Sequence, residues 1–125
     1  PAALDPDGAV LDRIAAALRP GGRLALTAFS AYFQVRFLGD DDHFDAGSGV
    51  NRERTVLRDP DGVEARADLW TSCFTPRELR LLCDRAGLDV DEIRSVTPGD
   101  YGPQLPDLEH PEFLVLGRRQ AVSGV

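Results

Sequence analysis

The residue types best suited to acid–base chemistry lie in an acidic stretch near the middle of the chain. His43 follows three aspartates, Asp40 to Asp42, and precedes Asp45. A histidine among carboxylates can act as a base toward an acidic hydroxyl, and carboxylates can also contribute to a divalent-cation site. The alternative is an ordinary solvated loop, because runs of charge are most often exposed to water. We keep His43 as a candidate base and predict no metal site.

A group of polar and aromatic side chains follows the most apolar strand-like run. Ser30, Tyr32 and Phe33 come directly after residues 23–29. Ligands of α/β sheets collect beyond the carboxyl ends of the strands, so these three residues are candidates for a substrate-binding wall. Ordinary packing of a short surface helix would explain them equally well.

Further candidates lie later in the chain. Trp70 falls on the charged side of a predicted strand, where it could close over a bound substrate, or a bulge could turn it into the core. Tyr101 and His110 belong to a loop rich in Pro and Gly, which could reach a pocket mouth or have only surface roles. Cys73 and Cys83 lack a metal-type spacing such as CxxC, which favours reduced cysteines in the core.

Composition limits the class of protein. The 125 residues are 42% hydrophobic and 28% charged, which is typical of a soluble folded domain. No apolar run approaches the roughly 20 residues of a membrane span, and no secretory signal is visible. The formal net charge of -7, with arginine as the only strongly basic residue, disfavours nucleic-acid binding. We therefore expect a cytoplasmic protein without a membrane or nucleic-acid partner, and the absence of Lys and Met suggests a GC-rich bacterial source.

The first half of the sequence predicts the start of an α/β fold. A helix has Asp5 as its N-cap and Pro6 at its first position, and it ends before a Pro-Gly-Gly turn. The near-continuous apolar run 23–29 that follows is typical of a strand buried on both faces of a parallel sheet. A short helix over 32–38 comes next. Residues 39–50 show no sustained periodicity and are predicted to be a loop.

The middle of the sequence predicts a hairpin and a second helix. Segments 52–58 and 63–74 flank Asp59-Pro-Asp-Gly62, a turn sequence typical of a β-hairpin. Thr75 and Glu78 then form a capping box that begins a helix, and Gly87 ends it. A weakly patterned strand should follow.

The last part of the sequence predicts two strands separated by a long loop. The first strand covers 90–96, the loop 98–111 and the second strand 112–117. Residues from Arg118 onward are expected to fray. The sequence therefore predicts an α/β fold with a terminal strand reached through a loop.

The order of these elements resembles the second half of the class I S-adenosylmethionine-dependent methyltransferases. The resemblance rests on Leu18-Arg-Pro-Gly-Gly22 before an apolar strand and on Phe74-Thr-Pro-Arg-Glu-Leu79 at the start of a helix that ends in Ala86-Gly87. It covers nearly the whole chain, from about Asp5 to Arg119. Each signal occurs in many folds, but their order and spacing together are fairly specific.

The resemblance implies the C-terminal part of a Rossmann-like sheet. Residues 23–29, 90–96 and 113–117 would be its fifth, sixth and seventh strands, with the seventh antiparallel between the other two, plus an inserted β-hairpin. Residues 1–119 would then form the C-terminal half of a methyltransferase domain, followed by a disordered tail at 120–125.

The resemblance also implies a function for the full-length protein, which is methyl transfer from S-adenosylmethionine to a small-molecule acceptor. Family members hold this cofactor with a glycine-rich turn after their first strand and an acidic residue at the end of their second. Gly47-Ser48-Gly49 lacks the preceding strand and following helix of such a turn. We therefore expect no cofactor-binding residues in this chain, an inactive isolated fragment and an acceptor side built around Ser30, Tyr32, Phe33, Trp70 and Tyr101.

Two other classes of function remain open. The chain could be a free-standing, non-catalytic module that forms a homodimer through the exposed edge of strand 23–29. It could also belong to another Rossmann-like enzyme, such as a dehydrogenase, whose nucleotide site lies upstream. An antiparallel last strand would count against the dehydrogenase, and a parallel one would exclude the methyltransferase.

Overall fold

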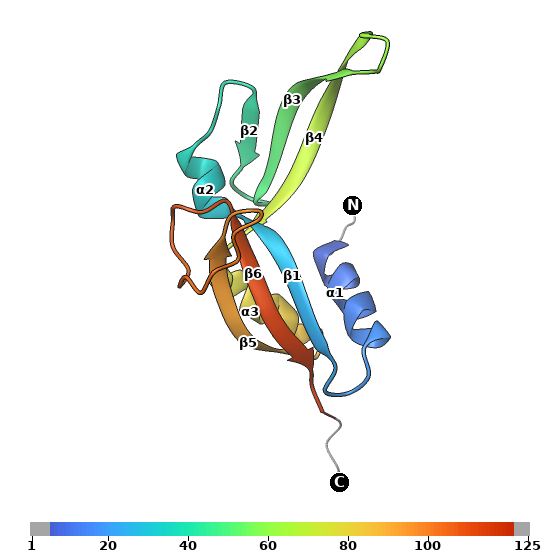
Figure 1. Ribbon diagram of the computed structural model, residues 1–125, viewed down its shortest axis with the longest axis vertical. Coiled ribbons are helices and arrows are strands. Elements are labelled where there is room, and N and C mark those ends of the chain that lie inside the picture. Colours follow the sequence, from blue (N-terminus) through green and yellow to red (C-terminus); the bar gives the residue numbers. More distant parts are fainter. Residues whose placement is uncertain (1–5, 122–125) are drawn as a thin grey trace.

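A computed structural model describes residues 6–121 of the chain (Figure 1). The expected N-cap Asp5 and residues 122–125 of the expected tail lie outside the described residues. In chain order the elements are α1 (Pro6–Ala17), β1 (Arg23–Ser30), α2 (Ala31–Arg36), β2 (Asp42–Asp45), β3 (Val50–Arg58), β4 (Glu64–Phe74), α3 (Pro76–Arg85), β5 (Leu88–Val96) and β6 (Glu112–Arg119).

The strands form one mixed sheet in the order β2-β3-β4-β1-β6-β5. Strand β6 lies between β1 and β5 and runs antiparallel to both, which confirms the predicted reversal of the last strand. Strands β1 and β4 are parallel, but they pair only at Phe29 with Cys73 and at Ser30 with Phe74. Strands β2, β3 and β4 therefore extend away from β1, β6 and β5, as Figure 1 shows.

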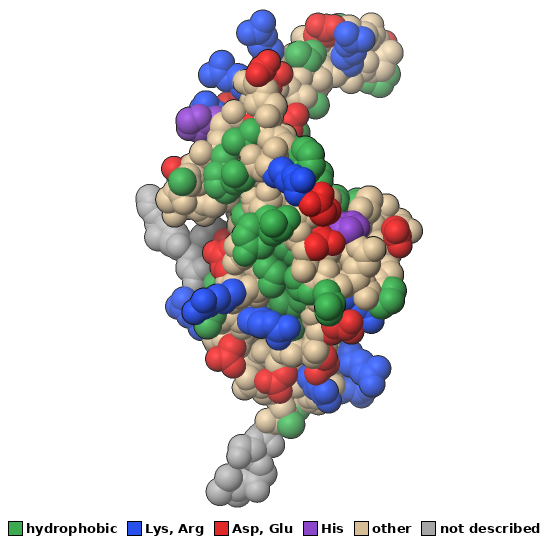
Figure 2. Space-filling view, turned by 90° about the vertical axis from the view of Figure 1, so that its left-hand side faces the viewer, with side chains coloured by type: hydrophobic (Ala, Val, Ile, Leu, Met, Phe, Trp, Pro, Cys, Tyr) green, Lys and Arg blue, Asp and Glu red, His purple; other side chains and the backbone are tan. Residues whose placement is uncertain are grey.

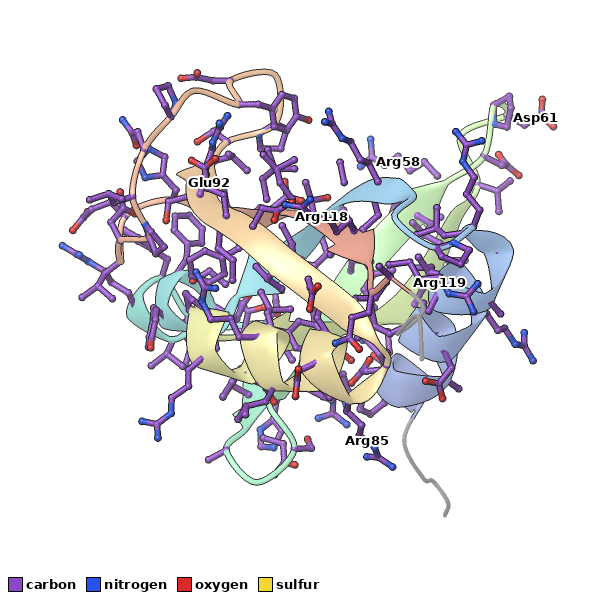
Figure 3. The ribbon with its side chains drawn as sticks, turned by 90° about the horizontal axis from the view of Figure 1, so that it is seen from below. Arg58, Asp61, Arg85, Glu92, Arg118 and Arg119 are labelled. Carbon is purple, nitrogen blue, oxygen red and sulfur yellow. The ribbon has the colours of Figure 1, made fainter. Side chains whose placement is uncertain are left out.

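Helices α1 and α3 pack on one face of the β1–β6–β5 part of the sheet. Phe113 and Val115 of β6 are fully buried beneath them, and Leu79 and Cys83 of α3 belong to the same buried core. Burying an aliphatic or aromatic side chain of this size stabilises a fold by about 1.5–3 kcal/mol. Figure 3 shows α3 on one side of the sheet, whereas the labelled Glu92 and Arg118 lie on the other side.

The predicted capping box begins α3. The Thr75 side chain accepts a hydrogen bond from the backbone N–H of Glu78 at 3.3 Å, and the Thr75 backbone N–H donates to the Glu78 carboxylate at 3.4 Å. Gly87 follows the helix with a φ of 82°, a conformation that favours glycine. Local sequence signals therefore set both ends of this helix.

The predicted β-hairpin consists of β3 and β4. The Asp59 carboxylate accepts hydrogen bonds from the backbone N–H groups of Asp61 and Val63, both at 2.9 Å, and Gly62 has a φ of 81°. Pairing is regular from Arg58 opposite Glu64 to Val50 opposite Ser72. The turn chemistry thus fixes the register of the whole hairpin.

Two predictions about irregular segments were wrong. The expected loop 39–50 contains β2, a short edge strand whose aspartates have a low strand propensity. Asn51 Nδ2 donates to the Asp42 carboxylate at 2.9 Å and helps to hold this strand against β3. Arg118 and Arg119 are not frayed, because both belong to β6 and Arg118 binds the Asp91 carboxylate at 2.8 Å.

No helix within residues 6–121 has the length and apolar character needed to cross a membrane.

Candidate functional site

The carboxyl ends of β1, β4 and β5 meet at one edge of the sheet. Ser30 ends β1, is 1% exposed and caps α2, because its Oγ accepts a hydrogen bond from the Phe33 N–H at 3.2 Å. The Ser30 N–H donates to the carbonyl oxygen of Pro111 at 2.9 Å. This contact places the end of the 97–111 loop directly beside β1. The edge therefore combines the end of β1, the start of α2 and the last loop.

Aromatic side chains of α2 lie at the same edge. Tyr32 is 43% exposed, and its ring meets Phe113 edge-on with the ring centroids 6.4 Å apart. Phe33 packs against Phe37 at 4.6 Å. Large apolar side chains of α2 and its C-terminal end are also exposed: Val35, Phe37 and Leu38. Figure 2 looks onto the side where α2 lies and shows hydrophobic side chains gathered in the middle of that face.

The loop between β5 and β6 carries an Asp–His pair that sequence reasoning missed. His110 Nδ1 lies 2.8 Å from the nearer oxygen of the Asp107 carboxylate, and the Asp107 N–H donates to the buried Ser95 Oγ at 2.7 Å. Burial opposes ionisation of Asp107, but hydrogen bonds from His110 and from nearby backbone N–H groups outweigh it and lower the pKa of this carboxyl. The Asp-x-x-His spacing was the available signal.

This loop is fastened to α2 and to β5. Arg36 of α2 forms an ion pair with Glu109, next to His110. The carbonyl oxygen of Tyr101 accepts a hydrogen bond from Arg94 of β5 at 3.5 Å, while the Tyr101 residue is 50% exposed. The structure thus brings Ser30, Tyr32 and Phe33 together, and it places Tyr101 on the loop that ends at the same edge.

The remaining two candidates, His43 and Trp70, flank Arg52 on the sheet formed by β2, β3 and β4. Arg52 of β3 lies opposite His43 of β2 on one side and opposite Trp70 of β4 on the other. Directly opposed residues of antiparallel strands point to the same face, so the three side chains form one row. Trp70 keeps regular pairing and is 67% exposed, so the bulge that would turn it into the core is absent. The His43 backbone pairs with Arg52, but within the described part of the chain its imidazole ring makes no hydrogen bond.

None of the candidate residues lines either of two well-defined hollows on the described part of the chain. The larger, of about 710 Å³, lies along the hairpin. Its lining residues are Asp41, Glu53, Arg54, Thr55, Val56, Arg66, Ala67 and Asp68. The smaller, of about 520 Å³, involves β1, β5 and β6. It is lined by Arg23, Leu24, Ala25, Asp91, Glu92, Leu116, Gly117 and Arg118. The candidate residues therefore form open walls rather than an enclosed pocket.

The cysteines lie in the core as free thiols, as predicted. Burial raises the pKa of Cys73 to about 11 and also raises the pKa of Cys83. A thiol with a raised pKa is a weak nucleophile at neutral pH. Among residues 6–121 no group of three His, Cys, Asp or Glu side chains is placed to hold a metal ion.

Within residues 6–121 no glycine-rich turn links a strand to a helix. S-adenosylmethionine needs backbone N–H groups of a glycine-rich turn between a strand and a helix. Gly47 and Gly49 instead lie in the turn between β2 and β3, and β1 passes into α2 through Ser30 and Ala31, without glycine.

Solved structures of other proteins share this arrangement of strands. The chain superposes on the CcbJ methyltransferase from Streptomyces caelestis with a TM-score of 0.70 and 17% identity, covering 92% of this chain and 53% of that one. This is the fold of the C-terminal half of a class I methyltransferase. An S-adenosylmethionine-dependent methyltransferase from Clostridium acetobutylicum matches with a TM-score of 0.66 and 12% identity, over 91% of this chain and 51% of that one.

A third solved structure shares the same fold. An S-adenosylmethionine-dependent methyltransferase from Mesorhizobium loti has a TM-score of 0.52 and 12% identity, over 93% of this chain and 57% of that chain. The chain thus spans about half the length of these solved structures. No family model and no curated protein matches the sequence.

Proposed function

We propose that this chain is the acceptor half of an S-adenosylmethionine-dependent methyltransferase that acts on a small molecule. The observation that carries the proposal is the reversed strand β6 between β1 and β5, in a fold shared with methyltransferases over nine-tenths of this chain. The hypothesis of a dehydrogenase loses support, because the sheet of such an enzyme would have a parallel last strand.

The uncovered surfaces of the sheet support the idea that a further segment packs here. Residues 23–28 of β1 pair with β6 on one side, and within the described part of the chain no strand pairs with them on the other. Helices α1 and α3 cover one face of the sheet, whereas the face with Glu92 and Arg118 carries no helix in Figure 3. A segment carrying the cofactor site would cover the unpaired edge and this open face.

The acceptor side is proposed to comprise α2, the 97–111 loop and the hairpin. Methyl transfer mainly requires the acceptor to be aligned with the donor and shielded from water. Tyr32 and Phe33 offer an apolar wall at the carboxyl edge of the sheet, where ligands of α/β sheets bind. The hairpin with Trp70 extends from the same edge, because Cys73 of β4 pairs with Phe29 at the end of β1.

The proposal predicts how cofactor binding divides between two proteins. The 125-residue chain should not bind S-adenosylmethionine in calorimetry. A longer protein, expressed from coding DNA that includes about 150 upstream codons, should bind it. This longer protein should also transfer tritiated methyl groups to small molecules. The upstream length is set by the usual size of half a domain. Micromolar binding by the 125-residue chain alone would contradict our assignment of the cofactor site to another segment.

The unpaired edge of β1 also supports a second function, a non-catalytic module that forms a homodimer. Exposed strand edges readily pair with a second chain. Light scattering of the purified 125-residue chain distinguishes the two proposals when it is combined with the upstream coding sequence. A stable dimer together with a stop codon directly before Pro1 would favour the module, and an open upstream reading frame containing a strand–glycine turn–helix unit would favour the methyltransferase.

A further inference from the structure

Arg52 differs from the other arginines of β3 because it faces an aromatic residue rather than an acid. Arg54 and Arg58 each form an ion pair with the residue opposite them on β4, at 3.9 Å and 2.7 Å. The Arg52 guanidinium carbon instead lies 5.7 Å from the centroid of the Trp70 ring. Among the described residues Arg52 has no carboxylate partner, although it is half-buried while Arg54 and Arg58 are exposed.

Contact with an aromatic ring leaves the hydrogen-bonding capacity of Arg52 unused. A guanidinium has five N–H donors in a planar fork that matches the two oxygens of a carboxylate. A cation–π contact stabilises the charge without occupying those donors. Trp70 is 67% exposed, so much of its indole is free to contact the apolar part of a ligand. The pair therefore offers an anion donor set and an aromatic surface side by side.

Two acidic residues near this pair, Asp45 and Asp68, already have partners. Asp45 lies next to His43 on the same face of the sheet, and its carboxylate accepts hydrogen bonds from the Ser48 N–H at 3.0 Å and from the Ser48 hydroxyl. Asp68, two residues before Trp70, faces Arg54. His43 lies directly opposite Arg52 on β2 and can donate a hydrogen bond to the same anion.

We propose that His43, Arg52 and Trp70 form a binding site for a small aromatic carboxylate. The net charge of -7 restricts the ligand to one with few negative charges, because a polyanion such as nucleic acid would be repelled. The guanidinium fork selects a planar acid group, and the exposed indole selects an aromatic or otherwise flat apolar body. Neither element selects a cation.

The position of the row connects this site to the carboxyl edge of the sheet. Trp70 precedes Cys73 by three strand residues, a distance of roughly 10 Å along an extended chain. Cys73 in turn pairs with Phe29 at the end of β1. A ligand of the size of a substituted aromatic acid can span this distance. Its identification as the methyl acceptor rests on the proposed function, whereas the binding site itself does not.

The single tryptophan of the sequence allows a direct test without the cofactor. Titration of the 125-residue chain with phenylacetate should change Trp70 fluorescence with saturation, and the uncharged phenylacetamide should bind at least tenfold more weakly. Arg52→Gln should weaken phenylacetate binding about tenfold or more, because a charge-assisted hydrogen bond is lost. Arg52→Lys keeps the positive charge but lacks the planar fork, so its affinity for phenylacetate should lie between those of the unchanged chain and of Arg52→Gln.

Arg54→Gln is the matched control, because it removes an arginine of the same strand whose ion pair is exposed. It should leave the dissociation constant within about twofold, and circular dichroism should show that all variants are folded.

Equal binding of phenylacetamide, no saturable binding of phenylacetate, or equal losses in the Arg52 and Arg54 variants would each overturn the proposal. A dependence of Trp70 emission on protein concentration alone would also overturn it, since a second copy would then cover the row. Intact binding in a full-length protein without methyl transfer would refute the proposed function but not this site.

Discussion

Gly117 is the position where the reversed strand β6 is most sensitive to one added methyl group. A Cβ atom built on Gly117 would overlap the carbonyl oxygen of Asp89 on β5, at a distance well below the 3.0 Å under which real Cβ contacts essentially never occur. The contact is with backbone, next to the irregular pairing between Val90 and Glu92. In Gly117→Ala the backbones of the two strands must therefore shift apart at this point.

The cost of Gly117→Ala has two parts. Overpacking of a well-ordered region costs about 1–3 kcal/mol, and a weakened hydrogen bond between β5 and β6 costs about 1 kcal/mol more. We therefore expect the free energy of unfolding to fall by about 2–4 kcal/mol. Urea unfolding followed by circular dichroism measures this difference directly.

Gly47→Ala is the matched control for this substitution. Gly47 has an ordinary φ, and its added Cβ would lie 3.9 Å from the Asp45 carboxylate, which is a normal contact. The same change of residue should therefore leave stability unchanged or raise it by up to about 1 kcal/mol, through the lower entropy of the unfolded chain. If the two variants agreed within about 0.5 kcal/mol, the close approach of β5 and β6 at Gly117 would be refuted.

Three further predictions concern other parts of the fold. Thr75→Ala removes the N-cap of α3 and should lower the free energy of unfolding by about 1 kcal/mol in urea, whereas Thr71→Ala in β4 tests the loss of a threonine that caps no helix. The folded pKa of Asp107 lies below its ordinary value of 3.8, so this carboxylate contributes stability that is present at neutral pH and is lost as the pH falls through the folded pKa. Asp107→Asn should accordingly flatten the acid side of the stability–pH curve, and an unchanged slope would contradict the Asp107–His110 contact. Burial raises the pKa of Cys73 to about 11, so its reaction with a thiol reagent at pH 8 should be slow in the folded chain and fast in urea.

Local sequence signals predicted the elements whose ends they encode. The capping box at Thr75, the turn at Asp59 and the apolar run at 23–29 each specify a structure within a few residues. The reversal of β6 could not be predicted in that way, because an apolar strand reads the same in either direction. It came from the resemblance in the order of elements, and the pairing with β1 and β5 confirms it.

The strand β2 was missed because tertiary pairing outweighs its composition. Its four residues include two aspartates, which disfavour strands, and the stabilising contact comes from Asn51 on the neighbouring strand. The role of Arg52 was missed for a related reason. The proposed role of Arg52 depends on Trp70, the residue opposite it on β4. This pairing is known only once the Asp59 turn has set the register of the hairpin.

The same dependence on neighbours explains why the site of this chain is open. Ser30, Tyr32 and Phe33 lie at the carboxyl edge of the sheet, where α/β folds bind ligands, yet the hollows described above lie elsewhere. An enclosed pocket at this edge needs a wall on the side where residues 23–28 of β1 have no strand partner. The further segment that we propose beside β1 would pair with this edge and supply the wall as well. The two proposals therefore predict different requirements for binding, since an aromatic acid would need only the exposed row of His43, Arg52 and Trp70, whereas the cofactor would need the further segment.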